Sequence, residues 1–133
     1  MDRVKDAMVA DPPMLDGHAS AQEAGEALGR PEVRVVFVCE EGRLVGVVTR
    51  KTLVREVVAA GRDPLSTKLR AIAEVPLNTI VSDLPLDEAF RFLEEHDLKR
   101  VPVLEGGRLV GVLSRAVLQR RLAEDELPVD EEL

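Results

Sequence analysis

The chain has 133 residues with a formal net charge of −7, and its 45% apolar and 32% charged residues are typical of a globular protein in water. No apolar run approaches the roughly 20 residues of a membrane helix, and the N-terminal sequence lacks the apolar centre of a signal peptide, so we expect a cytoplasmic protein with no membrane contact. One cysteine excludes an internal disulfide, and three Phe with no Tyr or Trp give little surface for stacking bases, which argues against a nucleic acid partner.

The first half of the chain predicts helices on either side of a β-hairpin. A capping box that begins at Ser20 opens a short helix, which a glycine and a proline end about ten residues later. The β-branched runs 33–39 and 43–48 are joined by a short connector that contains glycine, as a hairpin requires. Thr49 then stands at a helix N-cap position, and the helix that it opens is expected over residues 50–60.

The second half of the chain predicts the same order of elements. Residues 62–68 form a linker, and Ser66 or Thr67 is expected to cap a helix that ends at Ile72. The further expected elements are a helix from about Pro85, strands at 99–104 and 108–113, a helix at 115–123 capped by Ser114, and an acidic tail at 124–133. The tail holds six acidic residues and no basic one, which is typical of a solvated segment.

An internal repeat explains why the two halves agree. The segment 42–53, GRLVGVVTRKTL, recurs 65 residues later at 107–118 as GRLVGVLSRAVL, with eight of twelve positions identical. We therefore expect two units of an α/β (α+β) fold, one at 1–61 and one at 69–123. Each unit holds about 55 residues, near the lower limit for a self-sufficient core, so its sibling is the nearest partner surface. Continuous apolar strands predict sheets that helices cover on both faces.

The order of elements and the repeated segment resemble a tandem pair of cystathionine-β-synthase (CBS) domains, the Bateman module. The matching residues are those at 4–8, 23–24, 42–49, 87–89, 100–103 and 107–114. The resemblance implies that each unit is a three-stranded sheet with flanking helices. It also implies a pseudo-twofold axis between the units, clefts between them, and a homodimer of the chain.

The resemblance further implies a regulatory function without catalysis. CBS pairs commonly sense AMP, ADP, ATP or S-adenosylmethionine and regulate an enzyme or a transporter, so one of these compounds is the expected regulatory ligand. The residues themselves also argue against an enzyme, because one cysteine and two unmatched histidines form neither a metal-ligand set nor a catalytic triad. We therefore expect no metal and no catalytic residue.

The resemblance assigns ligand contacts to the strand–helix junction of each unit. In the family, a Ser or Thr there meets ribose or phosphate, and an Asp three residues later accepts the ribose hydroxyls. The residues at matching or neighbouring positions are Thr49, Arg50, Thr52, Ser114, Arg115, Arg100 and, through their main chains, Leu15 and Ile80. Free amides at a helix N-terminus favour an anion, although Thr49 and Ser114 also fit plain helix caps and the arginines also fit a solvated surface.

The chain departs from the family at the aspartate. Its position holds Thr52 in the first unit and Val117 in the second. Thr52 replaces one of the two hydrogen bonds of an aspartate and Val117 replaces neither, which predicts nucleoside binding weaker by about 2–4 kcal/mol. Two hypotheses therefore stand: a sensor of an adenine nucleotide or related adenosyl ligand, and a degenerate pair that serves dimerisation or contact with a partner protein and binds no nucleotide.

Overall fold

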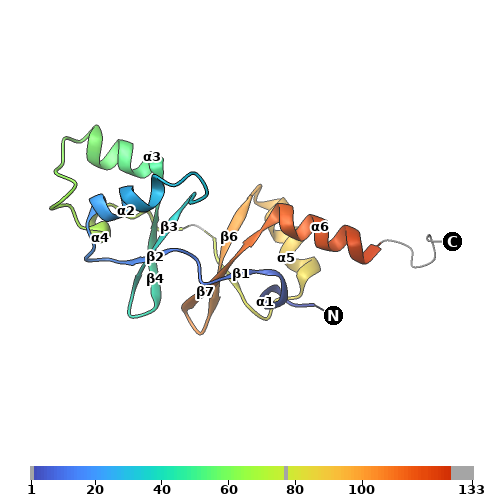
Figure 1. Cartoon of the computed structure of the whole chain (residues 1–133). Helices are drawn as coiled ribbons and strands as arrows, with labels where there is room; N and C mark the ends of the chain where they lie inside the picture. Colours follow the sequence, from blue (N-terminus) through green and yellow to red (C-terminus); the bar gives the residue numbers. More distant parts are fainter. Residues whose placement is uncertain (1, 77, 127–133) are drawn as a thin grey trace. The chain divides into compact units, whose positions relative to one another are not determined.

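The computed structural model describes residues 2–76 and 78–126 (Figure 1). In chain order the elements are α1 Val4–Ala7, β1 Val9–Ala10, β2 Met14–Asp16, α2 Ala21–Leu28, β3 Val36–Glu40, β4 Arg43–Val48, α3 Arg50–Leu53, the π-helix η1 Val54–Val58, α4 Leu69–Ile72, β5 Ile80–Val81, α5 Leu86–Glu95, β6 Arg100–Glu105, β7 Arg108–Ser114 and α6 Arg115–Glu126. The fold is mixed α/β, as the sequence predicts. Within the described ranges, none of the helices has the length and apolar character of a membrane span.

The described residues form two compact units, and the first helix of each repeat lies in the unit of the other repeat. The first-repeat unit contains residues 11–76 and 106–109, and the second-repeat unit contains residues 2–10, 78–105 and 110–126. α1 thus belongs with the second repeat and α4 with the first. The expected boundaries at 1–61, 62–68 and 69–123 follow the sequence repeats. They therefore differ from the compact units, in which the first helices are exchanged.

The sheet of the first-repeat unit has three strands, as the resemblance implies. β2 runs parallel to β3 with Leu15 opposite Val38, and β3 runs antiparallel to β4 with Val36 opposite Val48. The core behind this sheet is formed by buried side chains of α2, β3, β4, η1 and α4, namely Ala21, Ala24, Leu28, Val36, Val38, Val48, Val57, Leu69 and Ile72. Ser20 caps α2 by accepting a hydrogen bond from the Glu23 amide at 3.2 Å, which confirms the predicted helix start.

The second-repeat unit has the same three strands and gains a short fourth one. β5 runs parallel to β6 with Ile80 opposite Val103, and β6 neighbours β7. β1 adds to the other edge of β7 in antiparallel orientation, with Val9 opposite Val112. The core consists of Val4, Ile80, Leu86, Ala89, Leu93, Val101, Val103, Leu113 and Leu118. Val4 therefore contributes a fully buried side chain to the core of the second repeat.

The exchange of first helices follows the same hydrogen-bond pattern in both units. The amide of Val4 donates to the Leu84 carbonyl at 2.9 Å, and 65 residues later the amide of Leu69 donates to the Ala19 carbonyl at 2.9 Å. The two donors are 65 residues apart and so are the two acceptors, so the two contacts are equivalent. The repeat seen in the sequence is thus also a repeat of tertiary contacts.

Two repeated glycines make room for the exchanged segments. A Cβ atom at Gly46 would lie 2.6 Å from the Cβ of Ala73, and a Cβ atom at Gly111 would lie 2.8 Å from the carbonyl oxygen of Val9. Real Cβ atoms do not approach so closely, so these positions need glycine for close backbone approach. The glycine of the repeated V-G-V pattern, Gly46 or Gly111, therefore marks where the exchanged segment lies against the hairpin strand.

The local structure differs from the sequence predictions at four places. The helix expected over 50–60 divides into α3 and the π-helical η1, and residues 33–35 precede β3 rather than belonging to it. The predicted capping of α4 by Ser66 or Thr67 is wrong, because Lys68 is the N-cap and no side chain caps the helix. α6 continues to Glu126, into the expected acidic tail, and residues 127–133 lie outside the described part of the chain.

Candidate functional site

The predicted ligand residues fall into two half-sites, one in each compact unit. Leu15, Thr49, Arg50 and Thr52 lie in the first-repeat unit and form the first half-site. The second half-site lies in the second-repeat unit and contains Ile80, Arg100, Ser114 and Arg115. Each half-site is built where a hairpin strand ends and a helix begins.

Thr49 and Ser114 both cap the helices that follow them. Thr49 has an extended backbone, with φ −120° and ψ 175°, and its hydroxyl accepts a hydrogen bond from the amide of Thr52 at 3.3 Å. Ser114 accepts from the amide of Val117 at 3.4 Å. The predicted capping role is confirmed, and the second hydrogen-bonding capacity of each hydroxyl decides whether it also meets a ligand.

The second half-site contains a basic pocket. It has a volume of about 250 Å³ and is lined by Lys99, Arg100, Ser114, Arg115, Ala116 and Gln119. Three of these residues, Arg100, Ser114 and Arg115, are the ones that the sequence analysis assigned to ligand contacts. The amide of Arg115 donates to the Lys99 carbonyl at 2.8 Å, so the start of α6 is tied to the start of β6. This bond brings the two basic segments to one place.

The charges around the basic pocket favour an anion. Arg115 Nη1 lies 3.7 Å from Oδ1 of Asp97, whose side chain is 95% exposed, so this ion pair is weak. Among the described residues, no ion pair involves Lys99 or Arg100. The positive end of the twelve-residue helix α6 lies at the same place. Cationic side chains, a hydroxyl and free helix amides are the groups that bind phosphate in proteins.

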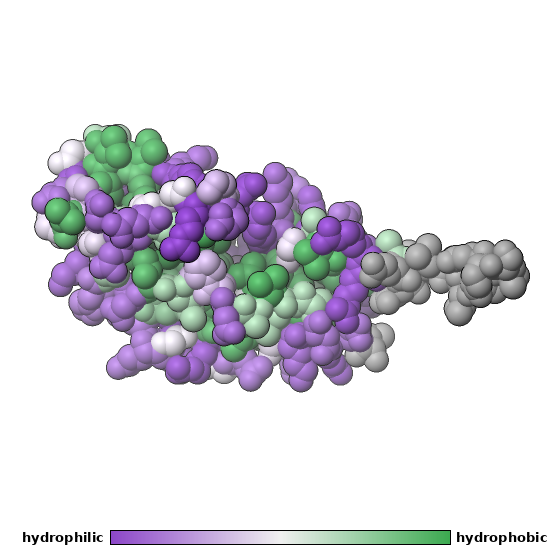
Figure 2. Space-filling model, in the orientation of Figure 1, coloured by the Kyte–Doolittle hydropathy of each residue, from purple (hydrophilic) through white to green (hydrophobic). Residues whose placement is uncertain are grey.

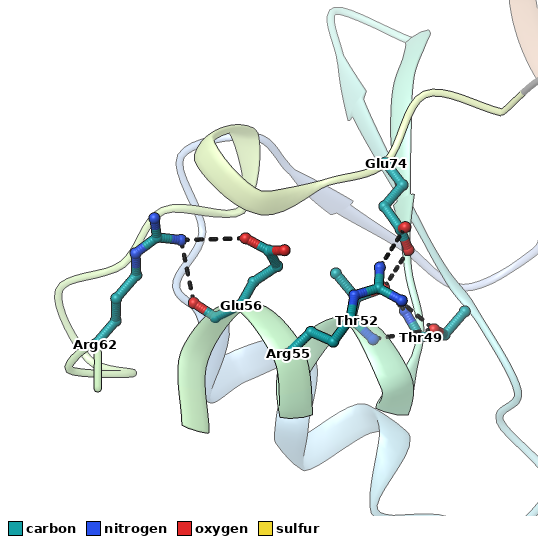
Figure 3. Close-up of polar contacts among 6 residues, drawn as sticks. All are labelled: Thr49, Thr52, Arg55, Glu56, Arg62 and Glu74. Carbon is teal, nitrogen blue, oxygen red and sulfur yellow. Dashed lines mark hydrogen bonds and ion pairs between the residues drawn. The ribbon is translucent and has the colours of Figure 1, made fainter. Parts of the chain in front are cut away.

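The first half-site is arranged differently, because its polar side chains bond to each other (Figure 3). Thr52 is completely buried, and its hydroxyl donates to Oε2 of Glu74 at 2.7 Å. Arg55 donates from Nη2 to Oε1 of the same carboxylate at 2.6 Å. The backbone of Glu74 in turn pairs with Val47 of β4 through bonds of 2.8 and 2.9 Å. We call Thr49, Thr52, Arg55 and Glu74 the threonine–glutamate clamp.

The clamp shifts the titration of its carboxyl group. The hydrogen bond from Thr52, followed by the hydrogen bond and charge of Arg55, holds the pKa of Glu74 below its usual range. Desolvation opposes this shift; its effect is smaller than that of the Thr52 hydrogen bond and larger than that of the Arg55 hydrogen bond. Glu74 is therefore ionised at neutral pH, and its carboxylate stands beside the position where the family places an aspartate.

The two arginines that the repeat makes equivalent have different partners. Arg50 donates from Nη2 to the carbonyls of Arg30 and Val33, at 2.9 Å each, and so closes the loop after α2. Arg115 is not engaged in this way and lines the basic pocket. A phosphate contact by Arg50 stays a prediction, and it would need a guanidinium that already holds two carbonyl groups.

Leu15 lies in β2 and Ile80 in β5, the strands that pair in parallel with β3 and β6. The side chain of Leu15 packs against the first-repeat core, and Ile80 is buried in the second-repeat core. Their side chains are therefore used for packing, and the ligand role predicted for them rests on their main chains. It stays a prediction.

Several residues of the two half-sites were not found by sequence reasoning. Lys99 directly precedes Arg100, and Gln119 follows Arg115 by one helical turn, so basic character and helical spacing were the available signals. Glu74 had a subtler signal. At the repeat spacing, the pair Thr52 and Glu74 corresponds to Val117 and Val9, so two polar residues are exchanged together for two valines.

The described residues form neither a metal-binding cluster nor an exposed, activated thiol. No group of three or more His, Cys, Asp or Glu side chains is suited to hold a metal ion there. Cys39 is buried in β3, and burial raises the pKa of its thiol, as expected of a core cysteine. His18 lies between Asp16, at 3.0 Å from Nδ1, and Arg70, at 3.2 Å from Nε2.

Comparison with known proteins gives consistent matches along most of the chain. Hypoxic response protein 1 of Mycobacterium tuberculosis is 27% identical over 125 residues, which cover 93% of this chain and 87% of that protein. The CBS domain-containing protein YhcV of Bacillus subtilis is 27% identical over 117 residues, covering 86% of this chain and 81% of the relative.

Solved structures extend these matches to the fold. The crystal structure of hypoxic response protein I with two coordinated zinc ions matches with a TM-score of 0.77 and 26% identity, over 91% of this chain and 99% of that chain. A family model of the CBS domain matches twice, at residues 4–59 and 69–124. The chain therefore belongs to the CBS domain family, a family of regulatory modules, and carries two CBS domains in tandem.

Proposed function

We propose that this chain is a non-enzymatic regulatory module that binds an adenine nucleotide, with the phosphate in the basic pocket of the second-repeat unit. The observation that carries the proposal is the pocket itself, which brings Lys99, Arg100 and Arg115 together with the Ser114 hydroxyl. Three cations at a helix N-terminus attract a multiply charged anion more than a neutral nucleoside.

The second half-site favours nucleotides over the other adenosyl ligand expected from the sequence. S-adenosylmethionine has no phosphate and carries a positive sulfonium group, so it gains little from a pocket of this charge. Val117 offers no acceptor to the ribose hydroxyls, and affinity must therefore come from the phosphate. We expect ATP and ADP to bind more tightly than AMP, and adenosine to bind weakly.

The first half-site supports a stoichiometry of one nucleotide per chain. The Thr52 hydroxyl donates to Glu74, and the Arg50 guanidinium holds two backbone carbonyls, so both polar groups already have partners inside the unit. A phosphate there would also meet the negative carboxylate of Glu74. We therefore assign the ligand to the second half-site.

Thermal melting with added ligand tests the proposal. ATP, ADP or AMP at a hundredfold excess over its Kd should stabilise the protein by about 2.7 kcal/mol. Adenosine and S-adenosylmethionine at the same concentrations should have little effect. Arg100→Gln and Arg115→Gln should each abolish most of the shift. Arg120→Gln removes the same charge from α6 outside the pocket lining and is the matched control. Absence of a shift with every phosphate compound would overturn the nucleotide assignment.

A second candidate function, self-association or contact with a partner protein, is favoured by an apolar surface of the first-repeat unit. Val54, Val58 and Leu65 are 57%, 74% and 71% exposed. Apolar side chains gather over α3 and η1 on this face (Figure 2). An adjoining groove of about 330 Å³ is lined by Ala21, Gln22, Gly25, Glu26, Leu53, Val57, Val58 and Pro64.

Sedimentation analysis distinguishes this function from a monomeric sensor. We expect a homodimer, and Val58→Glu should shift it to the monomer because a charge would have to be buried in the interface. Ala123→Glu, at the equivalent position of α6, is the matched control and should leave the dimer intact. A wild-type monomer at millimolar concentration would exclude self-association through this face.

A further inference from the structure

The two repeats differ in the helix that follows the hairpin. α6 is α-helical throughout, whereas the equivalent helix changes from α3 into the π-helical η1. The amide of Ala59 donates to the carbonyl of Val54 at 2.8 Å, and that of Arg62 donates to the carbonyl of Val57 at 2.9 Å. Both bonds span five residues, one more than in an α-helix. Since π-helical turns are rare and often lie at functional sites, this one calls for a physical cause.

The π-helical turn changes which side chains face the core. Thr52 and Val57 are 0% and 4% exposed, although five residues of an α-helix would separate them by about 140° around its axis. In α6 the residue equivalent to Leu53, Leu118, is fully buried, and Val117 is only partly buried. Leu53 itself is partly buried and lines the groove of about 330 Å³ beside Val57. The π-helical form thus buries a threonine and leaves a leucine in the groove.

The threonine–glutamate clamp supplies a contact that can hold the turn (Figure 3). Thr52 on α3 and Arg55 on η1 donate to different oxygens of the Glu74 carboxylate, at 2.7 and 2.6 Å. Glu74 is itself fixed, because its backbone is hydrogen-bonded to β4. In the second-repeat unit the equivalent positions hold Val117 and Val9, which cannot form these bonds, and α6 has no π-helical turn. The turn therefore accompanies the clamp.

We propose that the clamp is a latch that holds this helix in its π-helical form. When the latch is released, the helix adopts the α-helical register of α6, and Leu53 turns from the groove into the core. Ala21 of α2 stands where the second repeat has Leu86. Gly25 likewise stands where the second repeat has Phe90, so the first-repeat unit has room for the leucine.

The latch couples the clamp to the groove in both directions. An apolar group bound against Leu53 favours the π-helical form and therefore the closed clamp. Conversely, breaking the clamp removes Leu53 from the groove and weakens the binding of that group. Such reciprocity holds for any two sites that are linked through one two-state element.

Hydrogen-bond couplings measured by NMR test the latch directly. In the wild type, a long-range HNCO experiment should connect the Ala59 amide to the Val54 carbonyl. The double variant Thr52→Val, Glu74→Val reproduces the valine pair of the second-repeat unit. In this variant the Ala59 amide should be connected to the Arg55 carbonyl instead, four residues earlier. An unchanged connection, or its loss without a new one to Arg55, would overturn the proposal.

Two further variants keep this test decisive. Thr52→Val alone preserves the shape of the side chain and answers the same question if the double variant does not fold. Ile72→Val weakens the same core without touching the clamp and should keep the wild-type connection. A change of connection in Ile72→Val as well would mean that the core, rather than the clamp, holds the turn.

Thiol labelling measures the movement of residue 53. Leu53→Cys should react at least tenfold more slowly once Thr52→Val and Glu74→Val are added, because the side chain then faces the core. Destabilisation alone would accelerate labelling, so a slower reaction is specific to the change of register. Equal or faster labelling would contradict the latch.

Val58→Cys is the matched control for the labelling. Val58 is 74% exposed and its equivalent in α6, Ala123, is exposed as well, so its labelling rate should be the same with and without the clamp. The native Cys39 is buried and contributes only a slow background. These measurements use the protein without ligand. Failure of nucleotide binding in the second-repeat unit would therefore leave the latch standing, and failure of the latch would leave the nucleotide proposal standing.

Discussion

The hydroxyl of the buried Thr52 donates a hydrogen bond to Oε2 of Glu74 at 2.7 Å, and Arg55 donates to the other carboxylate oxygen. Glu74 also pairs its backbone with β4 and follows α4, the helix exchanged from the second repeat. The clamp therefore fastens α3 to the exchanged segment. In the second-repeat unit the equivalent positions hold Val117 and Val9, so the same contact is not available there.

Removing the Thr52 hydroxyl should lower the stability of the first-repeat unit. Thr52→Val keeps the shape of the side chain but leaves the Thr49 amide and Glu74 without the hydroxyl, at a cost of about 1–3 kcal/mol in unfolding free energy. Urea unfolding provides the measurement. A double-mutant cycle with Glu74→Gln should give a coupling energy of the same order, and purely additive effects would contradict the clamp.

The clamp should also make stability depend on acid pH. Since the pKa of Glu74 is lowered in the folded protein, its ionised form contributes stability above the ordinary glutamate pKa near 4.3. That contribution is lost progressively as the pH falls from there through the lowered pKa of Glu74 in the folded protein. NMR titration of the Glu74 side-chain carboxyl should show the lowered pKa. In Thr52→Val the pKa should rise towards its usual value, and an unchanged midpoint would show that Thr52 is not the main cause.

Introducing the family aspartate should tighten nucleotide binding in the second repeat and destabilise the protein in the first. Val117→Asp adds a carboxylate to the first turn of α6, where a negative charge is favourable, and should tighten AMP binding by about tenfold or more. Calorimetry with 2′,3′-dideoxy-AMP is the control, because that compound lacks the ribose hydroxyls and should show no gain. An equal gain for both compounds would mean that the new carboxylate does not meet the ribose.

Thr52→Asp should instead destabilise the protein. The new carboxylate would be buried beside Glu74, and two like charges at hydrogen-bond distance oppose each other. Thermal melting should show a loss that Glu74→Gln partly restores. Restoration by Asp87→Asn, an acid on α5, would point to net charge rather than to this contact.

The exchange of first helices predicts which fragments fold. A fragment of residues 11–76 retains Leu69 and Ile72, which are buried in the first-repeat core, whereas residues 1–61 lack both. Circular dichroism should therefore show a cooperative thermal transition for 11–76 and none for 1–61. A stable fold of 1–61 would mean that α1 can replace α4 in the same core.

Local signals in the sequence predicted the elements and their order well. Ser20, Thr49 and Ser114 all cap helices as expected, because capping depends on a few neighbouring residues. The exchange of first helices was not predictable, since residues 4–8 and 69–73 match each other and fit either core by pattern alone. The π-helical turn at η1 has no recognisable signal either.

The sequence predicted those residues of the candidate site that stand at motif positions. Arg100, Ser114 and Arg115 line one pocket, and their predicted contacts with a ligand stay a prediction. Arg50 was expected to be equivalent to Arg115, but its partners are carbonyls of the loop after α2, which depend on the local path of the backbone. Glu74 was missed because it lies in a segment without a motif and reaches Thr52 only through the exchange.

The exchange of first helices has a consequence for a single repeat on its own. A single ancestral copy would have kept its own first helix outside its own core, so it could complete that core only by swapping the helix with a second molecule. In the single chain neither repeat is a separable cassette, because each core contains buried residues that the other repeat supplies.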